Sequence, residues 1–188
     1  MSLFIDFNDP GLIIYTSHRQ IHRMPVKTIE ELKNRLNEKF NVILETTDLE
    51  QFKKEMTKNK EKHVFGCYFQ KKFVIFKLKT HIKPEKEIEA KHSKAWKNLN
   101  LPILHNILLK DCLGVDKEDI DFIKGIKNGV SNVNQKEDIK ALFIVNPTTL
   151  EEVHEVTNLG EIMPQKSTYF YPKPLSGLVI HKHTDEIE

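Results

Sequence analysis

Short apolar runs alternate with capped amphipathic segments along this chain, and that alternation most strongly limits what it can fold into. Thr28 and Glu31 have the spacing of a capping box, and apolar residues then recur at helical spacing, which predicts a helix over 29–40. Short β-branched runs between such segments are typical of buried strands. Because an amphipathic helix must bury its apolar face, we expect a sheet packed with helices.

Strands are expected at the apolar runs, and helices are expected to begin at the capping residues. The first run follows Pro10 and Gly11, and its β-branched composition predicts a buried strand. Pro102 is expected at the first position of a helix that Gly114 ends. The predicted strands are 12–15, 42–44, 63–69, 73–78, 120–123, 141–145 and 178–181, and further helices begin at Asp48 and at Thr148 or Thr149.

This order predicts an α+β fold in which a mixed β-sheet is packed with helices in two subregions. Residues 1–80 are expected to form a β-α-β-α-β-β subregion. Residues 81–100 are polar and contain the only tryptophan, Trp96, so they are expected to be a connecting segment with a helical turn. Residues 101–188 are expected to form a second α/β subregion.

Composition excludes several classes of protein. The 29 basic and 27 acidic residues of the 188-residue chain alternate along it and leave a net charge of +2, which argues against nucleic acid as a partner. No apolar run reaches the ~18 residues needed to span a bilayer, and no signal peptide is visible, so no membrane partner is expected. The chain has two cysteines, Cys67 and Cys112, and a disulfide framework would need more of them at closer spacing, which fits a cytoplasmic location.

Familiar catalytic and cofactor motifs are absent from the sequence. There is no phosphate-binding P-loop, no dinucleotide-binding glycine motif and no zinc-protease motif. The pairs His18/His22 and His181/His183 lack further ligands at metal-binding spacing. We therefore predict no metal site, and no cofactor held by this chain alone.

Two polar segments offer groups that could bind an anion. His18 and Arg19 follow a predicted strand, where α/β proteins often place ligand-binding groups. Lys166 beside two hydroxyls could hold a phosphate. The ligand-binding or phosphate-binding candidates are His18, Arg19, Gln165, Lys166, Ser167, Thr168, Tyr169 and Lys173, with His105 and Asn146 as secondary candidates.

Each of these candidates has an alternative explanation. The strand before Arg19 could simply leave the core, with Arg19 in a surface ion pair. Residues 163–173 could be an ordered aromatic loop that packs against the sheet. His105 borders the apolar face of its helix, which also suits a hydrogen-bonded core histidine.

The same segments carry a family resemblance. The sequences NDPGL and TSHR near the start, LPILH, NPTTLEEV, and the long GEIMPQKSTYFYPK are similar to those of the Domain of Unknown Function 1015 family of bacteria and archaea. The similarity follows the family's order across nearly the whole chain. The last of these motifs is long enough to be specific.

The resemblance implies that this chain is the C-terminal part of a longer protein. Family members are longer, and their N-terminal half ends in an Asp-Gly-His-His-Arg motif that resembles the phosphate-binding box of ParB-like and sulfiredoxin-like proteins. That motif is missing here. The resemblance therefore places nucleotide chemistry on the N-terminal half, and the isolated chain is expected to be inactive.

Two functions remain open. The full-length protein could be a kinase that uses ATP or ADP with magnesium to phosphorylate a small metabolite such as free serine. This chain would then form one wall of the ligand cleft. Alternatively, the chain could be a non-enzymatic binding or assembly module whose aromatic segment 163–173 contacts the N-terminal half or another subunit of a homo-oligomer.

Overall fold

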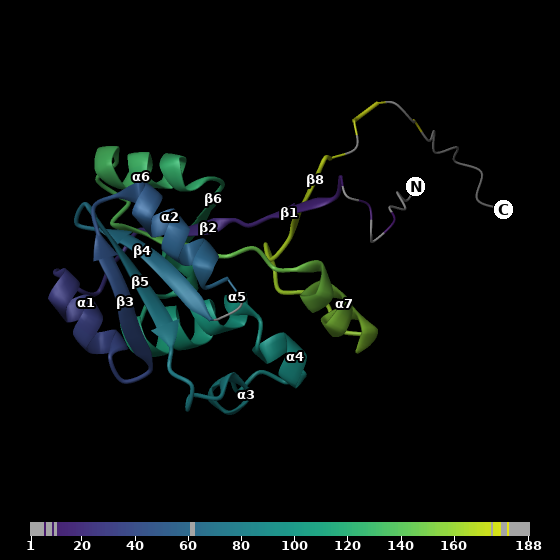
Figure 1. The fold of residues 1–188 in the computed structure, drawn as a ribbon, viewed down its shortest axis with the longest axis horizontal. Coiled ribbons are helices and arrows are strands. Elements are labelled where there is room, and N and C mark those ends of the chain that lie inside the picture. Colours follow the sequence, from purple (N-terminus) through teal and green to yellow (C-terminus); the bar gives the residue numbers. More distant parts are fainter. Residues whose placement is uncertain are drawn as a thin grey trace.

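A six-stranded sheet forms the centre of the protein (Figure 1). The computed structural model describes residues 6, 9, 11–60, 63–173, 175–177 and 180. The sheet order is β3-β5-β4-β7-β2-β6, and every neighbouring pair is antiparallel. Its strands are β2 (His18–Ile21), β3 (Phe40–Thr46), β4 (Val64–Phe69), β5 (Lys72–Leu78), β6 (Ile120–Ile123) and β7 (Ala141–Val145).

Helices cover both faces of this sheet (Figure 1). One apolar cluster joins one face of the sheet to α1 and η1, and a second cluster joins the other face to α2 and α6. The α+β prediction is confirmed. The helices are α1 (Ile29–Leu36), α2 (Leu49–Lys58), α3 (Pro84–Glu87), α4 (Lys94–Lys97), α5 (Asn100–Pro102), the π-helix η1 (Ile103–Leu113), the 3-10 helix η2 (Lys117–Asp119), α6 (Ile126–Gln135) and α7 (Leu150–Asn158).

Strand β7 links parts of the chain that are far apart in sequence. It lies between β4 and β2, and β6 pairs with the other edge of β2. The sheet therefore takes strands from both ranges expected as subregions, 1–80 and 101–188, while 81–100 carries α3 and α4. The boundaries of the two subregions stay a prediction.

Local capping signals were reliable, although one helix is shorter than expected. Thr28 accepts a hydrogen bond from the Glu31 backbone N–H at 3.1 Å, as the capping box predicts. The helix ends at Leu36, and Phe40 begins β3 instead of extending α1. Phe40 is still buried in the cluster that holds Leu36, so helical spacing correctly indicated its burial but not its backbone.

The expected helix from Pro102 also differs. Pro102 ends the short α5, and the next 11 residues form a π-helix that Gly114 closes in a left-handed conformation. Pro102 thus lies in the first turn of the helical stretch 100–113, where its missing N–H removes no helix hydrogen bond. Helix α6 was not expected, although its partly buried Ile126, Val130 and Val133 are spaced to face the sheet.

The first predicted strand is not buried. It forms as β1 (Ile13–Tyr15), which pairs with β8 (Tyr169–Tyr171) in a two-stranded ribbon beside the main sheet (Figure 1). The buried strand is the polar β2 that follows, because β2 is paired on both edges and lies between helices. Strand composition indicated the extended backbone but not its partners. Of the predicted strand 178–181, only Ile180 lies within the described residues, and it is not in a strand.

Within the residues that the structure describes, no helix is long and apolar enough to cross a bilayer.

One testable consequence concerns His22, which follows β2. Its Nε2 lies 2.8 Å from Asp121 Oδ2, and its Nδ1 lies 3.1 Å from the Asp138 carbonyl oxygen. The hydrogen bond with Asp121 raises the pKa of His22 above its ordinary value. A raised folded pKa means that this stabilisation is complete below about pH 6.5 and disappears as the pH rises through the folded value.

We therefore expect the stability advantage of the wild type over His22→Asn to shrink from about pH 5.5 to about pH 8.5. Thermal unfolding of both proteins across that range measures it. A difference in unfolding temperature that does not change with pH would contradict the pairing.

Candidate functional site

Arg19 lies in the core of the protein. Its side chain is fully buried, its Nε donates to His105 Nε2 at 3.0 Å, and another guanidinium nitrogen donates to the Ser17 carbonyl. The ring of Phe122, on the neighbouring strand, is centred 4.9 Å from the guanidinium carbon. The remaining guanidinium nitrogen has no hydrogen-bond partner among the described residues.

Burial controls the charges in this cluster. Burial, and next the charge of Arg19, lower the pKa of His105 to about 4, so His105 is neutral at pH 7 and can accept the hydrogen bond from Arg19. Burial lowers the pKa of Arg19 to about 10, which still leaves it charged. His18, on the opposite face of β2, has a pKa lowered to about 4 by burial and then by Arg19. These groups form a desolvated cluster inside the sheet.

The residues that follow Met163 lie in a different environment. Gln165 and Lys166 are exposed, and Thr168 is half-buried. Ser167 is buried, and its carbonyl accepts a hydrogen bond from Thr148 Oγ1 at 3.3 Å. Within the described part of the chain, no hydrogen bond or ion pair joins Arg19 to this segment.

The aromatic part of the same segment forms the ribbon. Tyr169 pairs with Tyr15 across β1 and β8. Lys173 Nζ lies 4.8 Å from the centre of the Tyr169 ring, and Lys124 Nζ lies 3.5 Å from it. Asn146, the other secondary candidate, donates to the Met56 carbonyl at 3.4 Å. The structure thus brings Arg19 to His105 and Lys173 to Tyr169, but it does not gather all the candidates at one place.

A cationic pocket lies beyond the end of β5. Its volume is about 480 Å³, and four of its 11 lining residues are lysines, whereas Glu85 is the only carboxylate among them. We call it the basic pocket. It is lined by His63, Lys77, Leu78, Lys79, Thr80, Ile82, Lys83, Pro84, Glu85, Lys94 and Asn98.

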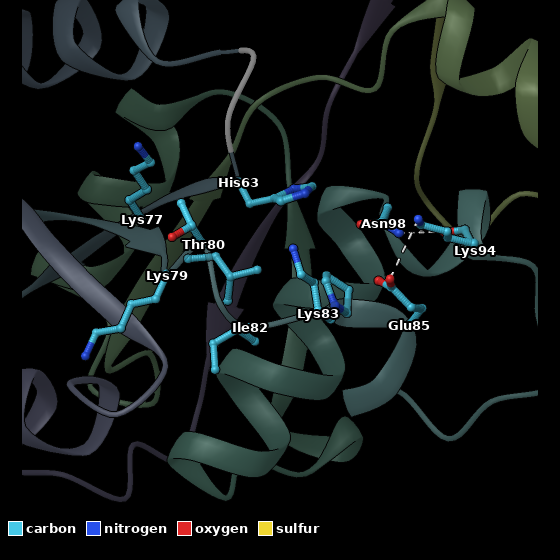
Figure 2. A pocket seen from close by; sticks show the side chains of 11 residues that line it. His63, Lys77, Lys79, Thr80, Ile82, Lys83, Glu85, Lys94 and Asn98 are labelled. Atoms are coloured by element: carbon cyan, nitrogen blue, oxygen red, sulfur yellow. Dashed lines mark hydrogen bonds and ion pairs between the residues drawn. The ribbon is translucent and has the colours of Figure 1, made fainter.

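Two of the four lysines contribute to its interior. Figure 2 shows Lys83 reaching toward His63, while Lys77 and Lys79 point away from the centre. Lys79 Nζ donates instead to the Asn37 carbonyl at 2.5 Å. Lys94 approaches the pocket from α4 and forms a 3.8 Å ion pair with Glu85.

Several elements fix the polar groups of the basic pocket. His63 precedes β4, and its Nδ1 lies 3.1 Å from Asn100 Oδ1. Since an amide oxygen only accepts, Nδ1 is assigned as the donor and Nε2 is left for another partner. Pro84 starts α3 immediately after Lys83, and Asn98 caps the end of α4. The pocket thus combines ammonium, imidazole, hydroxyl and amide groups.

A smaller pocket of about 370 Å³ adjoins the basic pocket and shares Lys94 and Asn98 with it. Its other wall is α7, which contributes Glu152 and Glu155. Burial raises the pKa of Glu152, whose Oε2 also accepts a hydrogen bond from the Thr149 backbone N–H at 2.8 Å. Helix α4 therefore lines both a cationic pocket and an acidic one that adjoins it.

The sequence does not predict the basic pocket, because its lining comes partly from the expected hairpin strands and partly from the range 81–100, which was expected only as a connection. The lysines at 77, 79, 83 and 94 have no regular spacing, so no periodic signal marks them. Their grouping depends on the turn that leads from β5 into α3. The high density of lysines from 77 to 97 is the sequence feature that could have indicated a cationic site in this region.

Comparison with protein families gives a match over residues 1–102 to the family described as protein of unknown function (DUF1015). The chain belongs to this family. Comparison with curated proteins found no match.

The similarity to solved structures is low, both in sequence identity and in TM-score. A mutant of free serine kinase in complex with AMP is 22% identical, with 90% of this chain and 58% of that chain covered and a TM-score of 0.45. Another mutant complex, with ADP, is 20% identical, with coverages of 90% and 58% and a TM-score of 0.43. A conserved hypothetical protein from Pyrococcus furiosus is 22% identical, with coverages of 90% and 60% and a TM-score of 0.43. The chain thus spans less than two thirds of the length of these proteins.

The buried pair of Arg19 and His105 gives a stability prediction. His105→Leu removes the acceptor and leaves a buried guanidinium N–H unpaired, so we expect a loss of about 1–3 kcal/mol in the free energy of unfolding. Urea unfolding measures this loss.

The double variant Arg19→Met/His105→Leu is the control, because it removes the unpaired charge together with the acceptor. We expect it to be more stable than His105→Leu alone. A single variant as stable as the wild type would show that the pair contributes nothing.

Proposed function

We propose that the basic pocket binds the phosphate groups of a nucleotide. In the longer protein it would form one wall of the ligand cleft of a nucleotide-dependent kinase of a small metabolite such as free serine. The observation that carries this proposal is the approach of Lys83 and Lys94 to one pocket whose lining includes a single carboxylate. Ammonium groups neutralise phosphate charge, and hydroxyl and amide groups donate hydrogen bonds to its oxygens.

The proposed reaction transfers a phosphoryl group from ATP or ADP to a hydroxyl of the metabolite. The bond from phosphorus to the nucleotide breaks, a bond to the metabolite oxygen forms, and the hydroxyl proton passes to a base. Such transfer depends mainly on positioning and on cations around the phosphate. Lys83 and Lys94 would supply part of that positive charge.

Magnesium would accompany the nucleotide in this proposal. The neighbouring acidic pocket offers Glu152 and Glu155, and carboxylate oxygens are ligands that magnesium accepts. Among the described residues, no group of three or more metal-ligating side chains is present, so the phosphates would have to supply further ligands. A cytoplasmic location, expected from the free thiols of Cys67 and Cys112, is part of the same proposal.

The ribbon favours a second function, assembly with another polypeptide. Ile13, Tyr15 and Tyr171 are each more than 40% exposed, and their register places them on one face together with Tyr169. The rings of Tyr15 and Tyr171 are 5.7 Å apart, centre to centre. A two-stranded ribbon gains little stability alone, and aromatic residues are frequent interface anchors. We propose that this face contacts either the N-terminal half of the same protein or another copy of it.

The nucleotide proposal predicts how affinity depends on the two lysines. Lys83→Ala and Lys94→Ala should each raise the Kd for ADP with magnesium about tenfold, since a charge-assisted contact at an open site contributes on the order of 1.4 kcal/mol. Isothermal titration calorimetry measures the change.

Lys127→Ala is the matched control, because it removes the same charge from α6, which lines neither pocket. The control should bind ADP like the wild type. Equal affinity in all four proteins would remove the basic pocket from the proposal.

The assembly proposal predicts self-association of this chain through the ribbon. Light scattering of the wild type should show a mass above that of the monomer, and Tyr15→Ser/Tyr171→Ser should reduce it. A wild type that stays monomeric at high concentration would contradict contact between copies.

A further inference from the structure

The start of α4 is held by the segment that follows α7. The Glu161 carboxylate accepts hydrogen bonds from the Ser93 backbone N–H at 2.8 Å and from the Ser93 hydroxyl at 2.5 Å. The same carboxylate lies 3.3 Å from His92 Nδ1. Trp96 Nε1 donates to the Ile162 carbonyl at 3.1 Å, and the Trp96 ring stacks on His92 with ring centres 3.9 Å apart. We call these contacts the α4 clamp.

Helix α4 is too short to hold its own position. It is four residues long, and none of them is buried. One turn of helix is unstable by itself, so contacts outside the helix must hold it. Opposite the clamp, the Asn98 side chain hydrogen-bonds the Glu85 carboxylate, and two further contacts among the described residues are the 3.8 Å pair of Lys94 with Glu85 and a 3.5 Å bond from Lys97 to the Glu85 carbonyl. The last two are long, whereas the two bonds from Ser93 to Glu161 are short and charge-assisted.

The α4 clamp holds a helix that contributes residues to the lining of the basic pocket. Lys94 follows Ser93 in the chain, and Asn98 caps the other end of the same helix. Lys94 and Asn98 both line the basic pocket and the acidic pocket beside it. Glu161 lines neither of them. A shift of α4 would therefore move two pocket groups at once without changing Glu161's own distance to a ligand.

We propose that Glu161 is a positioning residue for the basic pocket. By holding Ser93, it fixes α4 and so keeps the Lys94 ammonium and the Asn98 amide at the position where phosphate binds. This role rests on the proposed function of the pocket. It also explains why a carboxylate that is only about one-fifth exposed lies beside a helix that carries pocket cations yet pairs with the backbone and hydroxyl of Ser93 instead of with a lysine.

A double-mutant cycle tests this role. ADP with magnesium is titrated into the wild type, Glu161→Ala, Lys94→Ala and the double variant. We expect Glu161→Ala to raise the Kd severalfold in the wild-type background and to have a clearly smaller effect once Lys94 is absent, because only the part of its effect that passes through Asn98 then remains. Glu161→Gln keeps an oxygen for the Ser93 N–H and should recover most of the affinity. Glu137→Ala, at an exposed position outside both pockets, is the charge control.

The single tryptophan gives an independent readout. Trp96 lies inside the clamp, so its emission should shift to longer wavelength in Glu161→Ala even without ligand, as the ring becomes more exposed. Thermal unfolding of each variant shows whether the whole protein remains folded.

Three results would overturn the inference: an unchanged Kd in Glu161→Ala, an equal loss with and without Lys94, or an unchanged Trp96 emission. Failure of the wild type to bind ADP would overturn the proposed function itself. That failure is distinguishable, because the emission shift reports on the clamp whether or not ADP binds.

Discussion

Strand β7 is the element on which the rest of the structure depends, because it pairs with β4 on one edge and with β2 on the other. All five of its residues are buried, so both faces of the sheet at this point must be covered by helices. Helices α1 and η1 cover one face, and α2 and α6 cover the other. The pairing of β7 thus joins the early and late parts of the chain in one core, and it leaves 81–100 at the rim beside the end of β5.

Two kinds of positive charge serve different purposes in this arrangement. Arg19 is desolvated in the sheet and bonded to the neutral His105, so it stabilises the packing between β2 and η1 without meeting solvent. Lys83 and Lys94 lie at the rim, in a pocket open enough to admit a ligand. A cation that binds phosphate must be accessible and must also be held in place. Accessibility separates the rim lysines from Arg19, and the α4 clamp holds one of them.

Sequence patterns correctly predicted the features that depend on residues close together in the chain. The Thr28 cap, the Thr149 capping box and the β4–β5 hairpin all formed close to the expected residues. Burial of β2 and exposure of β1 could not be predicted, since each depends on pairing with strands far away in sequence. The basic pocket escaped for the same reason, because irregularly spaced lysines meet only after the chain turns from β5 into α3.

An NMR titration with ADP and magnesium tests the central claim, that phosphate binds in the basic pocket, most directly. Binding at this pocket should produce the largest changes in backbone amide shifts at His63, Thr80, Lys83 and Asn98, which surround it. Changes concentrated instead at residues 165–169, or no changes at millimolar ligand, would contradict it.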